Sequence, residues 1–255
     1  MILCLDVGNT QMYGGAYDGE KLLFTFRKKG VEGLSSDELA LFLGNILREQ
    51  NLDPKSITAV GFCSVVPQVI HSLKNAVRKY LNIEPITLGP GMKTGLKIKY
   101  KNPIEVGADR IANAMGANIL FPKKNKILVD LGTATTFCLV NSDNDYLGGA
   151  IAPGPRISME VLEEKTAMLP SVEIIQPLNC LGQTTIESIQ SGIYFSQLGL
   201  IKELTNRYKN EVFDGDAIVI GTGGFSSMFR EEVIFDEIVP DLVLKGLLSF
   251  ISKNL

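Results

Sequence analysis

The pattern of hydrophobic and polar positions alternates between the two-residue period of strands and the 3.6-residue period of helices. The order of these segments in the first half of the chain repeats in the second half. Residues 2–10 (ILCLDVGNT) and 127–136 (ILVDLGTATT) are apolar runs rich in leucine and β-branched side chains. Each run ends in Asp-x-Gly followed by small hydroxyl or amide residues, and the two aspartates, Asp6 and Asp130, are 124 positions apart. Because this spacing is close to half of the 255 residues, the sequence indicates an internal duplication.

Each of these runs is followed by two more apolar stretches with a polar turn between them. The turn is Asp18-Gly19 in the first half and residues 141–145 in the second half. Asp-Gly between two alternating runs is typical of a β-hairpin. Each half is therefore predicted to open with three antiparallel strands.

The apolar pattern then changes to the 3.6-residue period of helices. Helices are predicted, with Ser36 as the N-cap of the first, over residues 36–49, 66–80, 104–120, 185–208 and 242–252. Short buried strands are predicted over residues 57–64 and 217–221. Strands that alternate with helices indicate an α/β protein whose sheets are covered on both faces.

A basic turn that contains a proline, at residues 121–126, separates the two similar halves. We place the domain boundary there, because a composition change of this kind is typical of a connection between compact units. The expected division is an N-terminal lobe of residues 1–121 and a C-terminal lobe of residues 122–255.

The composition excludes several classes of protein. The chain has 25 basic and 28 acidic side chains and a net charge of −3, whereas nucleic-acid and anionic-membrane binders carry a basic excess. His71 is the single histidine, which excludes a site made of several histidines. An enzyme of this composition has to do its proton chemistry with carboxylates.

The cysteines and the N-terminus indicate a cytoplasmic protein. The four cysteines have no C-x-x-C spacing, so reduced thiols are expected rather than a disulfide framework or a zinc cluster: Cys4, Cys63, Cys138 and Cys180. Asp6 interrupts the N-terminal apolar run, so no secretory segment is predicted, and the later apolar stretches are too short to span a bilayer.

The repeated Asp-x-Gly turn has a specific chemical use. Glycine lets the backbone approach a phosphate, neighbouring N–H groups and Asn or Thr side chains bind its oxygens, and the aspartate can hold a cation. Either turn alone can be an ordinary strand connection, but two at equivalent positions favour a polyphosphate site. A third turn, at residues 221–224 (GTGG), is either a nucleoside contact or a tight strand-to-helix turn. The chain has neither a Walker A sequence nor a G-x-G-x-x-G fingerprint after a strand.

Five motifs together resemble the type III pantothenate kinase family, in the order and at the approximate spacing of that family. They are DVGNT at 6–10, PIEVGADR at 103–110, DLGTATT at 130–136, GGAIAPG at 148–154 and TIESIQSG at 185–192. The resemblance runs from the first predicted strand to the last helix. It implies two ribonuclease-H-like lobes of the actin-like ATPase, acetate and sugar kinase superfamily, with a nucleotide bound in the cleft between them. It also implies a homodimer that phosphorylates pantothenate with ATP to give 4'-phosphopantothenate, the first step of coenzyme A biosynthesis.

The same resemblance implies residue roles. The nucleotide-binding residues it implies are Asp6, Val7, Gly8, Asn9, Thr10, Gln11, Met12, Tyr13 and Thr133, with Asp6 near Mg²⁺. Asp130 matches the position that binds a monovalent cation, K⁺ or NH₄⁺. The implied pantothenate contacts are Tyr100, Gly107, Ala108, Asp109, Arg110 and Thr185, with Asp109 as the proton acceptor.

Elementary chemistry agrees with a role for Asp109. Phosphoryl transfer depends on positioning and charge neutralisation, and a general base adds roughly 10²–10⁴-fold. With the single histidine in an ordinary helical pattern, an aspartate is the natural base. The adjacent Arg110 can hold a substrate carboxylate and favours an ionised neighbour. Alternatively, Asp109 and Arg110 are a solvated pair at the start of a helix.

Two other functions remain open at this point. One is a kinase of the same superfamily that acts on another small hydroxylated acid, which the match of Tyr100, Arg110 and Thr185 argues against. The other is a non-catalytic nucleotide-binding regulator, because relatives of this family have been named as transcription accessory factors. The presence of all three aspartates, at positions 6, 109 and 130, argues against a loss of catalysis.

Overall fold

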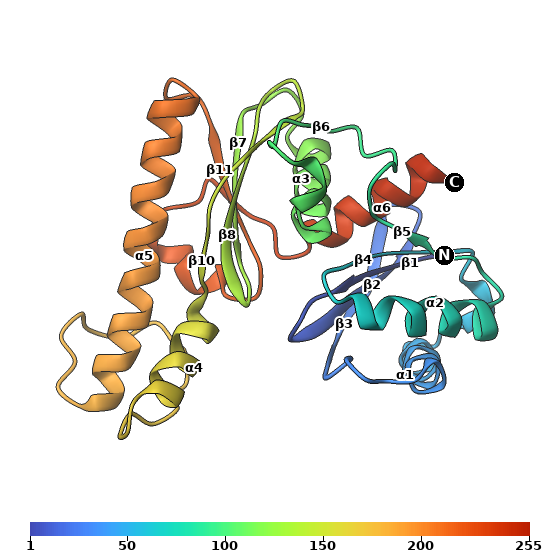
Figure 1. Cartoon of the computed structure of the whole chain (residues 1–255), viewed down its shortest axis with the longest axis horizontal. Coiled ribbons are helices and arrows are strands. Elements are labelled where there is room, and N and C mark those ends of the chain that lie inside the picture. Colours follow the sequence, from blue (N-terminus) through green and yellow to red (C-terminus); the bar gives the residue numbers. More distant parts are fainter. The chain divides into compact units, whose positions relative to one another are not determined.

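The computed structural model describes residues 1–255, and its helices and strands form two compact units (Figure 1). Unit 1 consists of Met1–Leu96, Lys101–Leu120 and Leu242–Leu255. Unit 2 consists of Lys97–Tyr100 and Phe121–Asp241. Each unit contains one β-sheet. None of the helices combines the length and the apolar composition needed to cross a membrane.

The sheet of unit 1 has five strands in the order β3-β2-β1-β4-β5. The strands are β1 (Ile2–Val7), β2 (Gln11–Asp18), β3 (Lys21–Lys29), β4 (Ala59–Ser64) and β5 (Ile86–Thr87). The first three are antiparallel, as predicted, and Gly19 closes their hairpin with a φ of 59°. In contrast, β4 is parallel to β1, and β5 is parallel to β4.

Four helices belong to unit 1, together with two short 3₁₀ segments, Pro54–Ser56 and Pro103–Glu105. The helices are α1 (Ser36–Glu49), α2 (Pro67–Leu81), α3 (Ala108–Leu120) and α6 (Leu242–Asn254). The predicted N-cap of α1 is wrong by one residue, since Ser35 accepts a hydrogen bond from the backbone N–H of Glu38 in a complete capping box. The helix predicted from residue 104 begins at Ala108 instead, because Val106 has extended backbone.

The alternation of β1 divides its side chains between two faces of the sheet. Leu3, Leu5 and Val7 pack in a core with apolar residues of α1 and α2. The opposite face packs against α6, because a Cβ on Gly61 of β4 would lie 2.3 Å from Ile251. Cys4 is the register partner of Gly61, so the even-numbered residues of β1, including Asp6, face the side of α3 and α6.

Helices α3 and α6 cross at backbone contact. A Cβ on Gly246 would lie 1.8 Å from the carbonyl oxygen of Ala112, and one on Gly116 would lie 2.3 Å from that of Leu242. This packing assigns the C-terminal helix to unit 1, which differs from the expected division at residue 121. The segment Lys97–Tyr100 differs as well, because its strand β6 (Lys97–Ile98) pairs with the sheet of unit 2.

The sheet of unit 2 repeats the strand order of unit 1. Its order is β12-β11-β7-β8-β9-β6, with β10 (Ile151–Pro153) paired to β8. The strands are β7 (Lys126–Leu131), β8 (Ala134–Val140), β9 (Asp145–Gly148), β11 (Ile218–Thr222) and β12 (Glu237–Ile238). As in unit 1, three antiparallel strands are followed by two parallel ones. The internal duplication is thus confirmed, with β7 in the place of β1.

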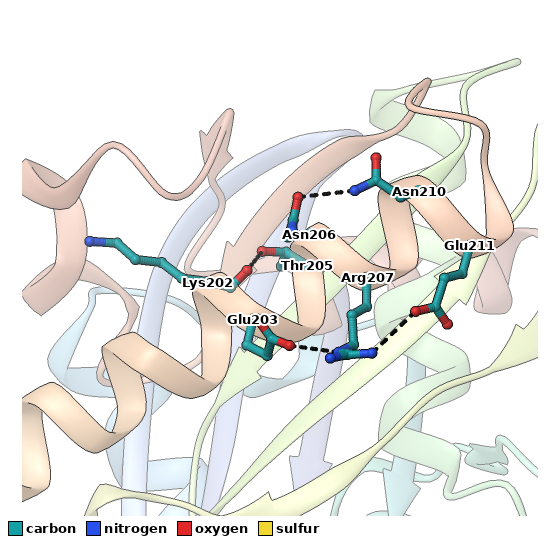
Figure 2. Close-up of polar contacts among 7 residues, drawn as sticks. All are labelled: Lys202, Glu203, Thr205, Asn206, Arg207, Asn210 and Glu211. Carbon is teal, nitrogen blue, oxygen red and sulfur yellow. Dashed lines mark hydrogen bonds and ion pairs between the residues drawn. The ribbon is translucent and has the colours of Figure 1, made fainter.

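Two helices of unit 2 matter for the site: α4 (Pro155–Lys165) and α5 (Thr185–Val212). A capping box of Thr184 and Glu187 starts α5, whose side chains Tyr194, Leu198 and Ile201 cover the odd-numbered face of β7. Figure 2 shows the solvated end of α5, where Arg207 contacts Glu203 at 2.6 Å and Glu211 at 3.4 Å. The pattern did not predict α4, although Pro155 at its first turn is a typical helix start.

Candidate functional site

The first Asp-x-Gly turn connects β1 to β2 through Gly8, Asn9 and Thr10. The backbone N–H of Gly8 donates to the carbonyl oxygen of Gln11 at 3.0 Å, which closes the turn. Asn9 is exposed, and Asp6 and Thr10 are half-buried. This turn therefore presents a carboxylate, an amide and a hydroxyl at the end of a buried strand.

The remaining residues of this loop are less available to a ligand. The side chains of Val7 and Met12 are fully buried in the core. The ring of Tyr13 is buried as well, and the guanidinium of Arg27 lies 4.0 Å from its centre. Any contact of Val7 or Met12 with a nucleotide has to be made by the backbone.

A buried thiol in unit 1 contacts Asp6 and is influenced by the charge of Asp109. Cys63 is the register partner of Asp6 on the parallel strand β4, and its Sγ donates to Asp6 Oδ1 at 3.2 Å. Burial raises the pKa of the Cys63 thiol well above its ordinary value, and the negative charges of Asp6 and Asp109 raise it further. The thiol is therefore protonated and can act as a hydrogen-bond donor to Asp6.

Asp109 lies in the first turn of α3, where the helix dipole favours a negative charge. Its Oδ1 accepts a hydrogen bond from the backbone N–H of Arg110 at 2.8 Å. A Cβ on Gly107 would lie 2.5 Å from the same oxygen, so glycine is needed for this arrangement. Arg110 is only 6% exposed, which contradicts the alternative of a solvated pair.

The second Asp-x-Gly turn, in unit 2, is one residue shorter and connects β7 to β8 through Gly132 and Thr133. The third glycine turn lies directly beside it. Gly223 has a φ of 85°, and a Cβ there would lie 2.3 Å from Asp130 Oδ1. A Cβ on Gly154, which precedes α4, would lie 2.4 Å from the carbonyl oxygen of Thr133. Backbone segments thus crowd around Asp130 and Thr133.

The other two candidate residues also lie in unit 2. Tyr100 is half-buried, and its ring lies 3.5 Å from the Cβ position of Gly148. Thr185 is exposed at the first turn of α5 and lines a groove of about 540 Å³. The groove lies between α4 and α5 and is mainly apolar. Tyr100 and Thr185 thus belong to a different unit from the run at 107–110.

The chain has no group of three or more His, Cys, Asp or Glu side chains that could hold a metal ion by themselves. Mg²⁺ in phosphoryl-transfer sites is commonly bound by one or two carboxylates together with substrate phosphates. Asp6, beside a turn with exposed polar groups, is a donor of this kind. The residues present therefore fit a magnesium ion that arrives with a nucleotide.

The sequence did not identify the neighbours of the two aspartates. The sequence predicted only that Cys63 is a reduced thiol; in the structure it is fully buried and donates a hydrogen bond to Asp6. Gly223 belongs to a turn that the sequence singled out, but its approach to Asp130 was not predicted. In the sequence, both residues could be recognised only as lying at the end of a buried strand. Only the strand order of each sheet shows that this strand is next to the strand that carries the aspartate.

The single histidine lies in a helix and the other cysteines are free thiols, as predicted. His71 is exposed on α2 and lies 2.9 Å from the side-chain nitrogen of Asn75. Cys4 and Cys138 are buried free thiols, whereas Cys180 is exposed.

The sequence is similar to known proteins along nearly its whole length. The type III pantothenate kinase family model matches residues 2–207. A type III pantothenate kinase of Legionella pneumophila is 53% identical over 248 residues, which cover 97% of this chain and 96% of that protein. A type III pantothenate kinase of Elusimicrobium minutum is 45% identical over 255 residues, which cover 100% and 99% of the two chains.

Solved structures with the same fold are more distant in sequence. A 2-dehydro-3-deoxygalactonokinase protein from Sinorhizobium meliloti has a TM-score of 0.65 at 11% identity, covering 99% of this chain and 96% of that one. A protein from Campylobacter jejuni, described as a Baf family transcriptional activator, has a TM-score of 0.61 at 20% identity and covers 99% and 98%. These structures share the α/β fold of this chain over nearly its whole length, so the expected fold class is confirmed.

The match to the Elusimicrobium minutum protein covers the whole chain and therefore includes the aspartate of β1, the start of α3 and the two glycine turns of unit 2. The chain belongs to the type III pantothenate kinase family.

Proposed function

We propose that this chain transfers the γ-phosphate of ATP to the primary hydroxyl of pantothenate, giving 4'-phosphopantothenate for coenzyme A synthesis. The observation that carries this proposal is identity of 53% to a type III pantothenate kinase over 97% of the chain. Four free cysteines without a disulfide fit the reducing cytoplasm, where ATP is available and where we expect the enzyme to act.

We assign the nucleotide contacts to both Asp-x-Gly turns. In unit 1 the side chains of Asn9 and Thr10 and the backbone from Val7 to Tyr13 contact phosphate oxygens. In unit 2 Thr133 contributes a further contact. The support is chemical, because exposed polar groups and backbone N–H groups at a tight turn are the typical ligands of phosphates. This assignment includes Gly8 and Gln11, whose backbone atoms close the first turn.

Asp109 is the proposed proton acceptor for the pantothenate hydroxyl. Its position in the first turn of α3 keeps a negative charge favourable. Gly107 and Ala108 shape the pocket at the start of this helix, and Arg110 provides the positive charge for an anionic substrate. Tyr100 and Thr185 are the proposed pantothenate contacts of unit 2.

Two cations complete the proposed chemistry. Mg²⁺, held by Asp6 and the nucleotide phosphates, would neutralise charge on the transferring phosphoryl group. A monovalent cation, K⁺ or NH₄⁺, is assigned to Asp130. The close approach of the Gly223 backbone to Asp130 supports this assignment, because it restricts the space beside the carboxylate to a small ligand.

We also propose that the enzyme is a homodimer. Large apolar side chains are exposed along α4, the segment after it and the start of α5: Val161, Met168, Leu178, Leu181 and Ile186. Exposed apolar surface of this extent is typical of an interface between subunits. Sedimentation velocity of the purified protein tests the assembly, and a monomer at micromolar concentration would refute it.

One assay tests the function. Purified protein is incubated with ATP and Mg²⁺ plus pantothenate, with and without K⁺ or NH₄⁺, and phosphopantothenate is measured by mass spectrometry. We expect product only with pantothenate and Mg²⁺, and more of it with a monovalent cation. Absence of product under all conditions would overturn the proposal. Turnover of another hydroxy acid, or nucleotide binding without any turnover, would favour one of the two alternative functions.

A further inference from the structure

Cys63 occupies a position that the proposed reaction leaves without a role. It is fully buried, lies at the carboxyl end of β4 and is the parallel register partner of Asp6. Its side chain faces the side of α3 and α6, which is also the side of Asp109. The thiol therefore contacts a candidate site residue, Asp6, while its own side chain is inaccessible to a ligand.

Cys63 is the donor in a hydrogen bond whose acceptor is one carboxylate oxygen of Asp6. The thiol donates to Asp6 Oδ1 at 3.2 Å, within the range for sulfur donors. A carboxylate rotates freely about its last side-chain bond unless a partner holds one of its oxygens. Groups that hydrogen-bond to a metal-binding carboxylate fix its orientation, and their loss typically costs 10–100-fold in metal affinity or activity.

A thiol is suited to this task because it is neutral. A lysine or arginine at the same place would offset the charge that a carboxylate offers to a cation. Its S–H group donates to Asp6 Oδ1 without bringing a positive charge to the site. It can therefore hold Asp6 while leaving its negative charge intact.

We propose that Cys63 is a positioning residue for phosphoryl transfer: its S–H group holds the Asp6 carboxylate in the orientation that receives the magnesium–nucleotide complex. This inference rests on the proposed function for the identity of the reaction. The hydrogen bond itself and its effect on magnesium–nucleotide binding are independent of pantothenate.

Three substitutions separate the donor from the volume of the side chain. Cys63→Ala removes both, Cys63→Val fills the space with a slightly larger apolar group and no donor, and Cys63→Ser keeps a donor. ADP binding is measured by calorimetry as a function of Mg²⁺ concentration, without pantothenate. We expect the half-saturating Mg²⁺ concentration to rise roughly tenfold in the Ala and Val variants and to stay close to the wild-type value in the Ser variant.

Cys4→Ala is the matched control. Cys4 is fully buried, lies on the same strand and faces the same side of the sheet two residues before Asp6. Its truncation should lower thermal stability without changing the magnesium dependence. An equal effect of Cys4→Ala, or a Cys63→Ser variant that behaves like Cys63→Ala, would reduce Cys63 to a packing role and overturn the proposal.

Infrared spectroscopy of the protein without nucleotide reads the bond directly. The difference between wild type and Cys63→Ser isolates the S–H stretching band of Cys63. We expect Asp6→Asn to move this band to higher frequency, because a neutral amide is a weaker acceptor than a carboxylate. An unmoved band would overturn the inference.

The kinetic counterpart of the Cys63 substitutions is a loss in kcat/KM for ATP with an unchanged KM for pantothenate. If wild-type protein does not phosphorylate pantothenate, the proposed function fails while the binding and infrared results still decide the role of Cys63.

Discussion

Strands β1 and β7 both end in an Asp-x-Gly turn, yet different groups lie next to the two aspartates. Asp6 and Asp130 stand at equivalent positions of two sheets with the same strand order. On the adjacent parallel strand, Cys63 is the register partner of Asp6, whereas Thr222 is the partner of Asp130. A thiol donates to Asp6, and the backbone of Gly223 crowds Asp130. The duplication thus preserved the strands and changed what surrounds each carboxylate.

A second difference lies in the helix that begins nearby. In unit 1, α3 brings Asp109 close enough to Cys63 for its charge to act on the thiol. In unit 2, the segment after the third glycine turn is a 3₁₀ helix, Ser226–Glu232. The thiol beside Asp6 is thus influenced by a second carboxylate, whereas the register partner of Asp130 is a threonine.

The largest expected effect tests this asymmetry in unit 1. Asp109→Asn removes the proposed base but keeps the size of the side chain, so we expect kcat to fall by roughly 10²–10⁴-fold. ADP binding and the melting temperature should stay near their wild-type values. Steady-state kinetics with pantothenate provide the measurement, and near-normal turnover would remove Asp109 from the base role.

The next effect tests the crowding in unit 2. Gly223→Ala places a Cβ 2.3 Å from Asp130 Oδ1 at a φ of 85°, so we expect a loss of about 3 kcal/mol in the free energy of unfolding. Gly224→Ala is the matched control, because no atom lies within 4 Å of its Cβ position. Urea unfolding compares the two. Equal stability of both variants would contradict the close approach.

Asp130→Ala tests the cation-binding half of the comparison. Two opposite charges about 3 Å apart in water attract with roughly 1.4 kcal/mol, a factor of about ten in affinity. We expect the half-activating concentration of K⁺ or NH₄⁺ to rise about tenfold, while the Mg²⁺ dependence changes little. A K⁺ activation curve that superimposes on that of wild type would place the cation elsewhere.

The smallest effect concerns the first residues of the two strands. Lys126 of β7 stands where β1 has Ile2, and it is fully buried, with its Nζ donating to the carbonyl oxygens of Phe121 and Lys124. Burial lowers the pKa of Lys126 from 10.5 to about 8. The unfolded chain therefore binds more protons between these values, and the free energy of unfolding rises with pH.

From pH 7 to pH 9 this group should add about 1 kcal/mol of stability. The free energy of unfolding of Lys126→Met, measured at both pH values, should lack this increase relative to wild type. The same increase in the variant would show that the pH dependence arises from other groups. Ile2→Val in β1 is the control that leaves the increase in place.

Much of the fold could be predicted from local patterns. Side-chain periods of 2 and 3.6 residues predicted the two hairpins and five helices. The repeated Asp-x-Gly motif at the ends of β1 and β7 predicted the duplication. The predictions of element boundaries were wrong where a local backbone or capping contact, rather than the hydrophobic pattern, determines where a helix begins. Ser35 rather than Ser36 caps α1, because its side chain meets the N–H of Glu38. Helix α4 was missed, since Pro153 and Gly154 resemble the end of a strand.

The candidate site was predictable to the extent that its residues form contiguous motifs. DVGNT and GADR single out Asp6 and Asp109 as candidates, and the burial of Arg110 contradicts the solvated alternative. The loop residues Val7 and Met12 belonged to the same motif region, yet their side chains pack into the core. A motif names positions, whereas alternation along a strand decides which side chains reach a ligand.

By itself the sequence determined the duplication, the α/β class, the family and the two aspartate turns, because these depend on residues that are near one another along the chain. Only the tertiary structure decided that Cys63 holds Asp6, that Gly223 crowds Asp130 and that α6 packs on α3 in unit 1. The physical reason is that neighbours in a parallel sheet are joined by long crossovers, so register and helix crossing depend on packing between distant segments.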